Sequence, residues 1–168
     1  MILPLLGKQP QIGQGSFVAP SSDIIGDVKI GSNCSIWFNT TLRVDVMPIV
    51  IGDETNIQDN SVIHGTFKKC GAVIGNRVTV GHSVILHGCT IGDKVLIGMG
   101  AVIMDLAKIP STSIVGAGSL VTENATFPGG YLILGRPAKA IRPLSESELA
   151  FLDKSANNYI EYLSWYKK

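Results

Sequence analysis

Aliphatic residues recur every six positions along most of the chain. Ile, Leu or Val occupies each step of three series, which are Ile12, Val18, Ile24, Ile30, Ile36 and Leu42; Ile51, Ile57 and Ile63; and Ile74, Val80 and Leu86. After the loss of one residue, the period continues at Ile91, Ile97, Ile103, Ile109, Val115 and Val121. An α-helix would place apolar residues three and four positions apart, and this stretch does not follow that pattern. The period therefore indicates a repeat architecture.

Each six-residue unit is typical of one short strand followed by a turn. Glycine often follows the aliphatic residue, as in IGSNCS, IGDETN and IGNRVT, and a small or aliphatic residue such as Cys34 or Val84 comes four positions after it. Three units would close a triangular coil of about 18 residues, with the aliphatic side chains stacked inside. We expect Gly, Asn and Asp to form the corners, where positive φ is tolerated. The pattern resembles the hexapeptide repeat of the left-handed parallel β-helix, and the handedness is taken from that resemblance.

Two interruptions of the period predict loops that leave the wall of the solenoid. One is VDVMP, between Leu42 and Ile51, and the other is TFKKCGA, between Ile63 and Ile74. The repeat ends near Val121. We expect residues 1–143 to form the β-helix together with a returning segment, which contains PGG at 128–130 and GRPAK at 135–139.

The last part of the chain, residues 144–168, predicts one helix packed on the β-helix within a single domain. Ser145 followed by Glu148 is a capping-box pattern that starts a helix. From there to Trp165 the sequence is amphipathic. The predicted apolar face consists of Leu149, Leu152, Ala156, Tyr159, Ile160 and Leu163.

Composition narrows the class of function. Lys plus Arg number 14 and Asp plus Glu 13 in 168 residues, so no basic surface favours nucleic acid. The start of the chain lacks the features of a signal peptide, and no apolar run is long enough for a membrane span. Three cysteines without a CxxC motif predict free thiols and a cytoplasmic protein.

The only three histidines of the chain, His64, His82 and His87, fall within one short window. Ile63 and Leu86, which directly precede His64 and His87, are one coil apart once the insertion is removed. We therefore expect these two histidines side by side on one face, at the ~4.8 Å spacing of neighbouring strands. Arg43 belongs to the same column.

The third histidine, His82, follows Val80 by two positions and should lie on the neighbouring face, stacked on Asp59. Two histidines on one face and one on another suit a metal poorly within one chain. If three chains pack around a threefold axis, however, one chain can supply His64 and His87 while its neighbour supplies His82. This arrangement gives three histidine ligands and an open fourth position, as in catalytic zinc sites. The alternative is that the histidines are ordinary surface residues.

The sequence also resembles the γ-class carbonic anhydrase family over nearly its whole length. The motifs that carry the resemblance are RVD at 43–45, NIQDNSVIH at 56–64 and GHSVILHG at 81–88. The resemblance implies a homotrimer that hydrates carbon dioxide reversibly to bicarbonate, by a hydroxide on zinc, or on iron(II) or cobalt(II) in its place. No membrane or nucleic-acid partner is expected.

Roles for individual residues follow from the same resemblance. It implies that His64, His82 and His87 are the metal ligands, with His82 donated across the interface. Arg43 and Asp45 resemble an ion pair that holds neighbouring subunits. Gln58 resembles the residue that orients the metal-bound hydroxide, Asn56 and Asp59 resemble its polar partners, and Tyr159 is expected to reach the same pocket.

The sequence departs from the family pattern at the proton-transfer step. Val46 occupies the position of a glutamate, and the short basic loop GTFKKC replaces an acidic loop that carries a shuttle glutamate. Two other functions therefore stay open. One is a hexapeptide acyltransferase or acyl-thioester hydrolase, and the other is a non-catalytic metal-binding or assembly protein.

Overall fold

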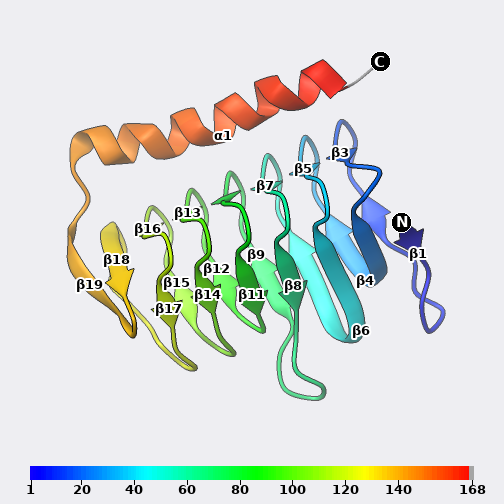
Figure 1. The fold of residues 1–168 in the computed structure, drawn as a ribbon, viewed down its shortest axis with the longest axis horizontal. Helices are drawn as coiled ribbons and strands as arrows, with labels where there is room; N and C mark the ends of the chain where they lie inside the picture. The colour runs from blue at the N-terminus through cyan, green and yellow to red at the C-terminus, as the bar shows by residue number, and fades with distance from the viewer. Residues whose placement is uncertain (167–168) are drawn as a thin grey trace.

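The computed structural model describes residues 1–166, which form a parallel β-solenoid with one C-terminal helix (Figure 1). The predicted fold class is thus confirmed. The wall has three faces. The histidine face contains β1 (Ile2–Leu3), the first halves of β4 (Asp23–Ile30) and β6 (Thr41–Ile51), β8 (Val62–His64), β11 (Ile85–His87), β14 (Val102–Ile103) and β17 (Leu120–Val121).

The open face contains β2 (Gln11–Ile12), the second halves of β4 and β6, β9 (Ala72–Ile74), β12 (Thr90–Ile91) and β15 (Lys108–Ile109). The helix face contains β3 (Phe17–Val18), β5 (Ser35–Ile36), β7 (Asn56–Ile57), β10 (Thr79–Val80), β13 (Leu96–Ile97), β16 (Ile114–Val115), β18 (Tyr131–Gly135) and β19 (Ala138–Pro143). Helix α1 (Glu146–Tyr166) runs along this face, antiparallel to the direction in which the coils advance (Figure 1).

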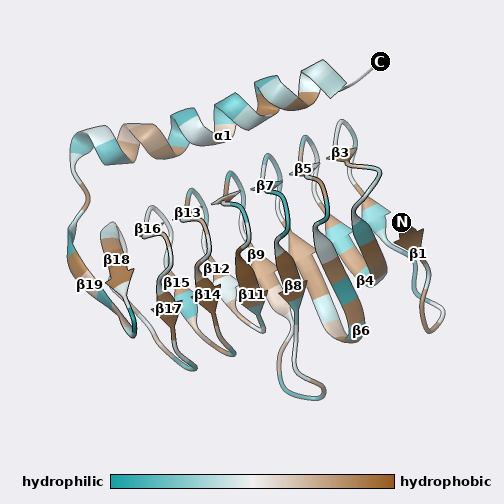
Figure 2. Cartoon of the chain, in the orientation of Figure 1, coloured by the Kyte–Doolittle hydropathy of each residue, from teal (hydrophilic) through white to brown (hydrophobic). Residues whose placement is uncertain are grey.

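The period of six produces the core directly. Ile24, Leu42, Ile63, Leu86 and Ile103 are completely buried and stack in register from β4 to β14. Burying an aliphatic side chain of this size contributes about 1.5–3 kcal/mol. The first coil is the exception, because Ile12 lies at the open end and stays 37% exposed. Figure 2 shows β8, β11, β14 and β17 of the histidine face as mainly hydrophobic and the turns between strands as more polar.

The corners differ from the prediction in one respect. Positive φ occurs three residues after the inward aliphatic residue, as at Asn60, Arg77 and Leu106, and not at the glycine that follows it directly. That glycine is required for close stacking instead: a Cβ on Gly52 would lie 2.8 Å from the backbone of Gly75 one coil away. Several types of non-glycine residue thus occupy the left-handed position, but the glycine position has no room for a side chain.

One predicted loop is absent and the other is confirmed. VDVMP does not leave the wall, because β6 runs without a break from Thr41 to Ile51 and pairs with β4 across the corner; the extra residues are absorbed by a register shift opposite Gly26 and Val28. By contrast, the segment after β8 leaves the wall as a loop closed by a bridge between Thr66 and Cys70 (Figure 1). The returning segment is the antiparallel pair β18 and β19.

The C-terminal helix is anchored as predicted at its start. The Ser145 amide donates to Glu148 Oε2 at 2.8 Å, and the Glu148 amide donates to Ser145 Oγ at 3.2 Å. The predicted apolar face is correct at Leu152, Ala156 and Leu163, which are buried, but wrong at Leu149, which is 40% exposed. Of the described residues, no helix is long and apolar enough to span a membrane.

Candidate metal centre

His64 and His87 end the neighbouring strands β8 and β11. The strand register places them directly opposite each other, which confirms the predicted pair. The ring centroids are 5.2 Å apart, and His64 Nδ1 lies 3.2 Å from His87 Nε2. Because successive side chains of a strand alternate between faces, both rings point outward from the wall.

A carboxylate holds one ring nitrogen of every histidine. Asp45 Oδ1 lies 2.8 Å from His64 Nε2, and Asp105 Oδ1 lies 2.6 Å from His87 Nδ1. An ionised carboxylate can only accept a hydrogen bond, so these two nitrogens carry the hydrogen. In the neutral tautomers, the lone pairs of His64 Nδ1 and His87 Nε2 then face each other. The lone pairs repel unless a proton or a cation lies between them.

The separation of these two nitrogens fits a shared cation. Two imidazoles bound to zinc at 2.0–2.1 Å with tetrahedral geometry have nitrogens about 3.3–3.4 Å apart. The observed distance between His64 Nδ1 and His87 Nε2 is 3.2 Å. Moreover, metal-bound histidines generally donate their other N–H to a carboxylate, as these two do. The donor set therefore fits a divalent cation such as zinc.

His82 lies apart from this pair, in the turn that joins β10 of the helix face to β11 of the histidine face. Asp59 Oδ2 lies 2.9 Å from His82 Nδ1, so the predicted stacking of these residues is confirmed. Among the described residues the other ring nitrogen has no hydrogen-bond partner, and the side chain is 46% exposed. Within residues 1–166 of one chain, no three His, Cys, Asp or Glu side chains are placed to hold a metal together.

Asp105 is the main site residue that the sequence analysis missed. It is only 6% exposed and accepts hydrogen bonds from His87, from Thr66 Oγ1 at 2.7 Å and from Lys69 Nζ at 2.9 Å. Burial alone would raise the pKa of Asp105, but these hydrogen bonds outweigh it and lower the pKa well below its usual range. The loop after β8 thus contributes to the site through Thr66 and Lys69. Lys69 also pairs with Glu123 at 3.2 Å.

Arg43 and Asp45, predicted as an ion pair between subunits, contact each other within the chain. The hydrogen bond from His64 lowers the pKa of Asp45, and the charge of Arg43 adds to this effect. Asp45 therefore links the predicted ion pair to the histidine pair. The Arg43 side chain is 45% exposed, so it has room to contact a second chain as well.

The predicted polar residues form a buried chain of hydrogen bonds on the helix face. Gln58 Nε2 donates to Asn56 Oδ1 at 3.2 Å, and Asn56 Nδ2 donates to Thr79 Oγ1 at 3.0 Å. Ser155 of α1, which the sequence did not suggest, donates to Thr79 Oγ1 at 3.0 Å. Gln58 donates one N–H of its side-chain amide to Asn56, and its carbonyl oxygen can accept a hydrogen bond from a ligand.

Tyr159 and His82 line the same groove as Gln58, about 520 Å³ in volume, between α1 and the helix face. Tyr159 thus lies in the same groove as His82 and Gln58. Burial raises the pKa of Tyr159, and the negative charge of Asp59 raises it further, so the hydroxyl keeps its proton at neutral pH.

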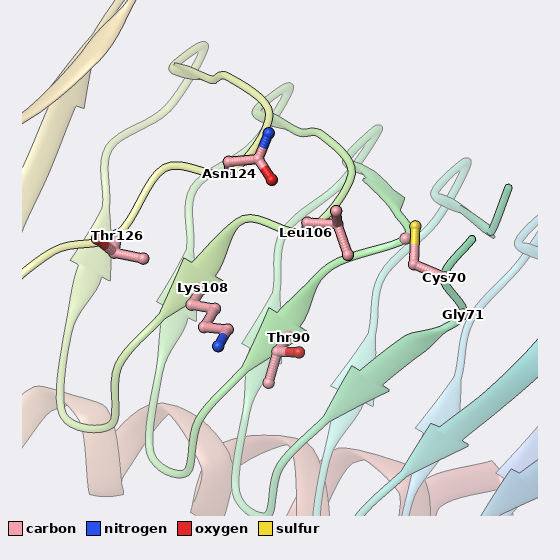
Figure 3. Close-up of a pocket in the computed structure, with 8 residues that line it drawn as sticks. Cys70, Gly71, Thr90, Leu106, Lys108, Asn124 and Thr126 are labelled. Carbon is pink, nitrogen blue, oxygen red and sulfur yellow. The ribbon is translucent and has the colours of Figure 1, made fainter.

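A second hollow of about 390 Å³ lies on the open face (Figure 3). It is lined by Cys70, Gly71, Gly88, Thr90, Leu106, Lys108, Asn124 and Thr126. No predicted site residue within 1–166 is among them. Cys34, Cys70 and Cys89 are free buried thiols, as predicted.

Fold and site together define a hexapeptide-repeat β-solenoid that carries a histidine cluster of metal-binding character at one corner. A family model described as "Bacterial transferase hexapeptide (six repeats)" matches residues 9–43 and 71–105. A protein from Geobacillus kaustophilus named "Carbonic anhydrase" is 46% identical over 99% of this chain and 91% of its own length. The chain belongs to the γ-class carbonic anhydrase family.

Two further comparisons define how far the similarity extends. "Gamma carbonic anhydrase 1, mitochondrial" from Arabidopsis thaliana is 42% identical over 94% of this chain, but the match spans only 59% of that relative's length. The crystal structure of a hexapeptide transferase family protein from Anaplasma phagocytophilum superposes with a TM-score of 0.95 at 45% identity, covering 99% of this chain and 98% of the other.

Proposed function

We propose that the chain forms a homotrimer in which His64 and His87 of one subunit and His82 of a neighbour bind a divalent cation. We infer zinc, with iron(II) or cobalt(II) as the other cations that such a donor set accepts. The proposed activity is the reversible hydration of carbon dioxide to bicarbonate. The observation that carries the proposal is the histidine pair, whose unprotonated nitrogens face each other at 3.2 Å while carboxylates hold the opposite nitrogens.

An exposed apolar ladder supports association through the histidine face. Val62, Ile85, Val102 and Leu120 lie opposite one another on β8, β11, β14 and β17. Val62 and Ile85 are 39% and 41% exposed. They are two positions from His64 and His87 along the same strands and point to the same side. A continuous apolar strip of this kind is typical of an interface, and a threefold arrangement would bring this face of each chain toward the axis.

Each site residue has a definite task in this proposal. A bound cation supplies Lewis acidity, which brings the pKa of a water molecule near 7. Asp45, Asp105 and Asp59 fix the tautomers of the three histidines, so that an unprotonated nitrogen of each remains for the cation. The carbonyl oxygen of Gln58 accepts a hydrogen bond from the attacking water and orients it. Hydration adds the water oxygen to carbon dioxide and releases one proton.

Relatives named carbonic anhydrases support the activity. The match to the Geobacillus protein is nearly full length. The three free thiols favour a reducing compartment, which we infer to be the cytoplasm. The likeness to a hexapeptide transferase family protein from Anaplasma phagocytophilum leaves acyl transfer as the competing activity. A histidine base for acyl transfer needs no metal, so one cation per histidine cluster would favour hydration.

Mixing two inactive variants tests the shared site. The variant His82→Ala keeps the histidine pair, whereas the double variant His64→Ala/His87→Ala keeps only His82. Each alone should bind no cation and hydrate no carbon dioxide. After unfolding, mixing in equal amounts and refolding, random trimers should regain about a quarter of the sites, because an intact pair then meets an intact His82 at some interfaces. Metal content and stopped-flow hydration should both recover.

Recovery of neither quantity, in refolded mixtures that are trimeric by light scattering, would refute the interface assignment. Recovery of the metal without hydration would refute the proposed activity and retain the metal site. As a control, refolded wild-type chain must recover full metal content under the same conditions.

A further inference from the structure

The groove beneath α1 is much larger than carbon dioxide requires. Its volume of about 520 Å³ lies within the ~300–1,000 Å³ that is typical of small-molecule sites. Carbon dioxide has only three atoms and would occupy one end of it. The remaining space needs another explanation.

The two ends of the groove differ in chemistry. At the coils of β7 and β10 it is lined by Gln58, Thr79, His82, Ser155 and Tyr159, which are polar. Towards the coils of β13 and β16, the walls consist mainly of Leu96, Met99, Ile114 and Phe151.

Two of these apolar side chains are about half exposed. Met99 is 59% and Phe151 47% exposed, and they come from opposite sides of the groove, the wall and the helix. Large exposed apolar side chains that line the same groove favour an apolar ligand there. The groove is therefore amphipathic along its length, with the polar end at the histidine of the proposed metal site.

We propose that this groove binds a straight-chain aliphatic carboxylate. The carboxylate lies beside His82 and Gln58, and the alkyl chain extends along Leu96, Met99, Ile114 and Phe151. The position of the head group rests on the proposed function, because a carboxylate offers a cation the same pair of anionic oxygens as bicarbonate. The position of the tail rests on the groove alone.

The length of the groove specifies the class of ligand. β7, β10, β13 and β16 are consecutive neighbours in the sheet, so the groove crosses three strand spacings. At ~4.8 Å each, this amounts to about 14 Å. An extended chain of medium length, such as octanoate or decanoate, fills that distance. Acetate and butanoate leave the apolar end empty.

Calorimetric titration of the zinc-loaded protein with a series from acetate to dodecanoate tests the proposal. We expect affinity to rise about two- to fourfold per methylene up to octanoate or decanoate and then to level off, since each buried methylene adds a constant increment. The double variant Met99→Ala/Phe151→Ala should weaken octanoate binding on the order of tenfold and leave acetate unchanged. The matched control is Ile141→Ala, an equally exposed apolar residue on β19 that does not line the groove.

Affinity that does not depend on chain length would overturn the proposal, as would a chain-length gain that survives in the double variant. Metal content and carbon dioxide hydration of the same samples separate this outcome from failure of the proposed function. If the protein binds no metal but still binds octanoate, and binds it more weakly in the double variant, the groove assignment stands and the metal assignment fails. If the metal and hydration are present without any chain-length effect, only the groove assignment fails.

Discussion

Asp105→Asn tests whether a buried carboxylate sets the metal affinity. Both oxygens of Asp105 are occupied: Oδ1 accepts from His87, and Oδ2 accepts from Thr66 and Lys69. Asparagine has nearly the same shape but keeps one acceptor oxygen and adds an NH2 group. If the NH2 group faces His87 Nδ1, that nitrogen must become the acceptor and the hydrogen moves to Nε2, the proposed ligand atom. If the NH2 group faces Thr66 and Lys69 instead, it meets two side chains that donate hydrogen bonds to Asp105 in the wild type.

The expected loss follows from the contacts of Asp105. Replacing a carboxylate that orients a metal-bound histidine typically weakens metal binding ~10–100-fold, or about 1.4–2.7 kcal/mol. Loss of a buried charged hydrogen bond should also lower the free energy of unfolding of the metal-free protein by about 1.5–3 kcal/mol. The loss of metal affinity and the loss of stability should appear together, because the same carboxylate accepts hydrogen bonds from His87 and from the loop residues Thr66 and Lys69.

Competition with a chromophoric chelator at neutral pH measures the metal affinity. Asp93→Asn is the matched control, because Asp93 Oδ1 accepts the Asn76 amide at 2.7 Å in the turn between β12 and β13, at another corner of the coil from the histidine pair. Wild-type affinity in Asp105→Asn, or an equal loss in Asp93→Asn, would refute the assigned role of Asp105.

The pH dependence provides an independent check on the same residue. The pKa of Asp105 is lower in the folded chain than its usual value of 3.8. Its contribution to stability is therefore fully present above the unfolded pKa and is lost as the pH falls through the folded pKa. The difference in unfolding free energy between wild type and Asp105→Asn should be constant above about pH 5 and shrink in more acidic solution. A difference that grows on acidification would contradict the assignment.

Three further predictions concern the fold. Ile97→Ala removes a completely buried member of the core and should lower the free energy of unfolding in urea by about 2–5 kcal/mol, whereas a loss below about 1 kcal/mol would mean that the stack collapses around the cavity. Ser145→Ala removes the cap of α1 and should cost about 1 kcal/mol and speed amide exchange in the first turn; unchanged exchange would show that the cap is dispensable. Burial raises the pKa of Cys34 to about 11 and that of Cys89 to about 12, so both should resist alkylation at pH 8 until the protein unfolds, and rapid labelling by intact mass would contradict their burial.

Much of the fold follows from sequence because the repeat is local. A period of six specifies which side chains point inward, and every aliphatic residue of that period from Ile24 to Val121 is buried. The sequence predicts a loop at VDVMP, whereas the structure has a continuous strand with a bulge. A break in the period alone does not distinguish these two cases. The pairing of β4 with β6 decides between them, and that pairing is not visible in β6 alone.

The helix shows a similar limit. Its hydrophobic face was predicted to include Leu149, yet Ser155 is buried in its place. Ser155 is buried because Thr79 of the wall offers it a hydrogen-bond partner. Hydropathy alone does not contain that information.

The site was partly accessible from sequence. One coil leads from Leu86 to Ile103, and therefore from His87 to Met104, because one residue is missing from the period there. Asp105 lies one position further, so the carboxylate could have been found by searching the neighbours of that column. Lys69 could not, since it lies in the loop after β8, where the period gives no positions. The convergence of His82 with the other two histidines requires a second chain, so it stays a prediction.

The loop after β8 lies outside the core, so the residues that surround the site are separate from the residues that stabilise the fold. It leaves the wall after His64 and returns at Gly71 without disturbing the stacking of Ile63 and Ile74 on their neighbours. Lengthening or recharging it would change what surrounds Asp105 and His87 at little cost to the core. The solenoid thus provides a segment in which the surroundings of the proposed metal site can vary while the histidine pair stays in place. Relatives with different loops here should differ far more in turnover than in stability.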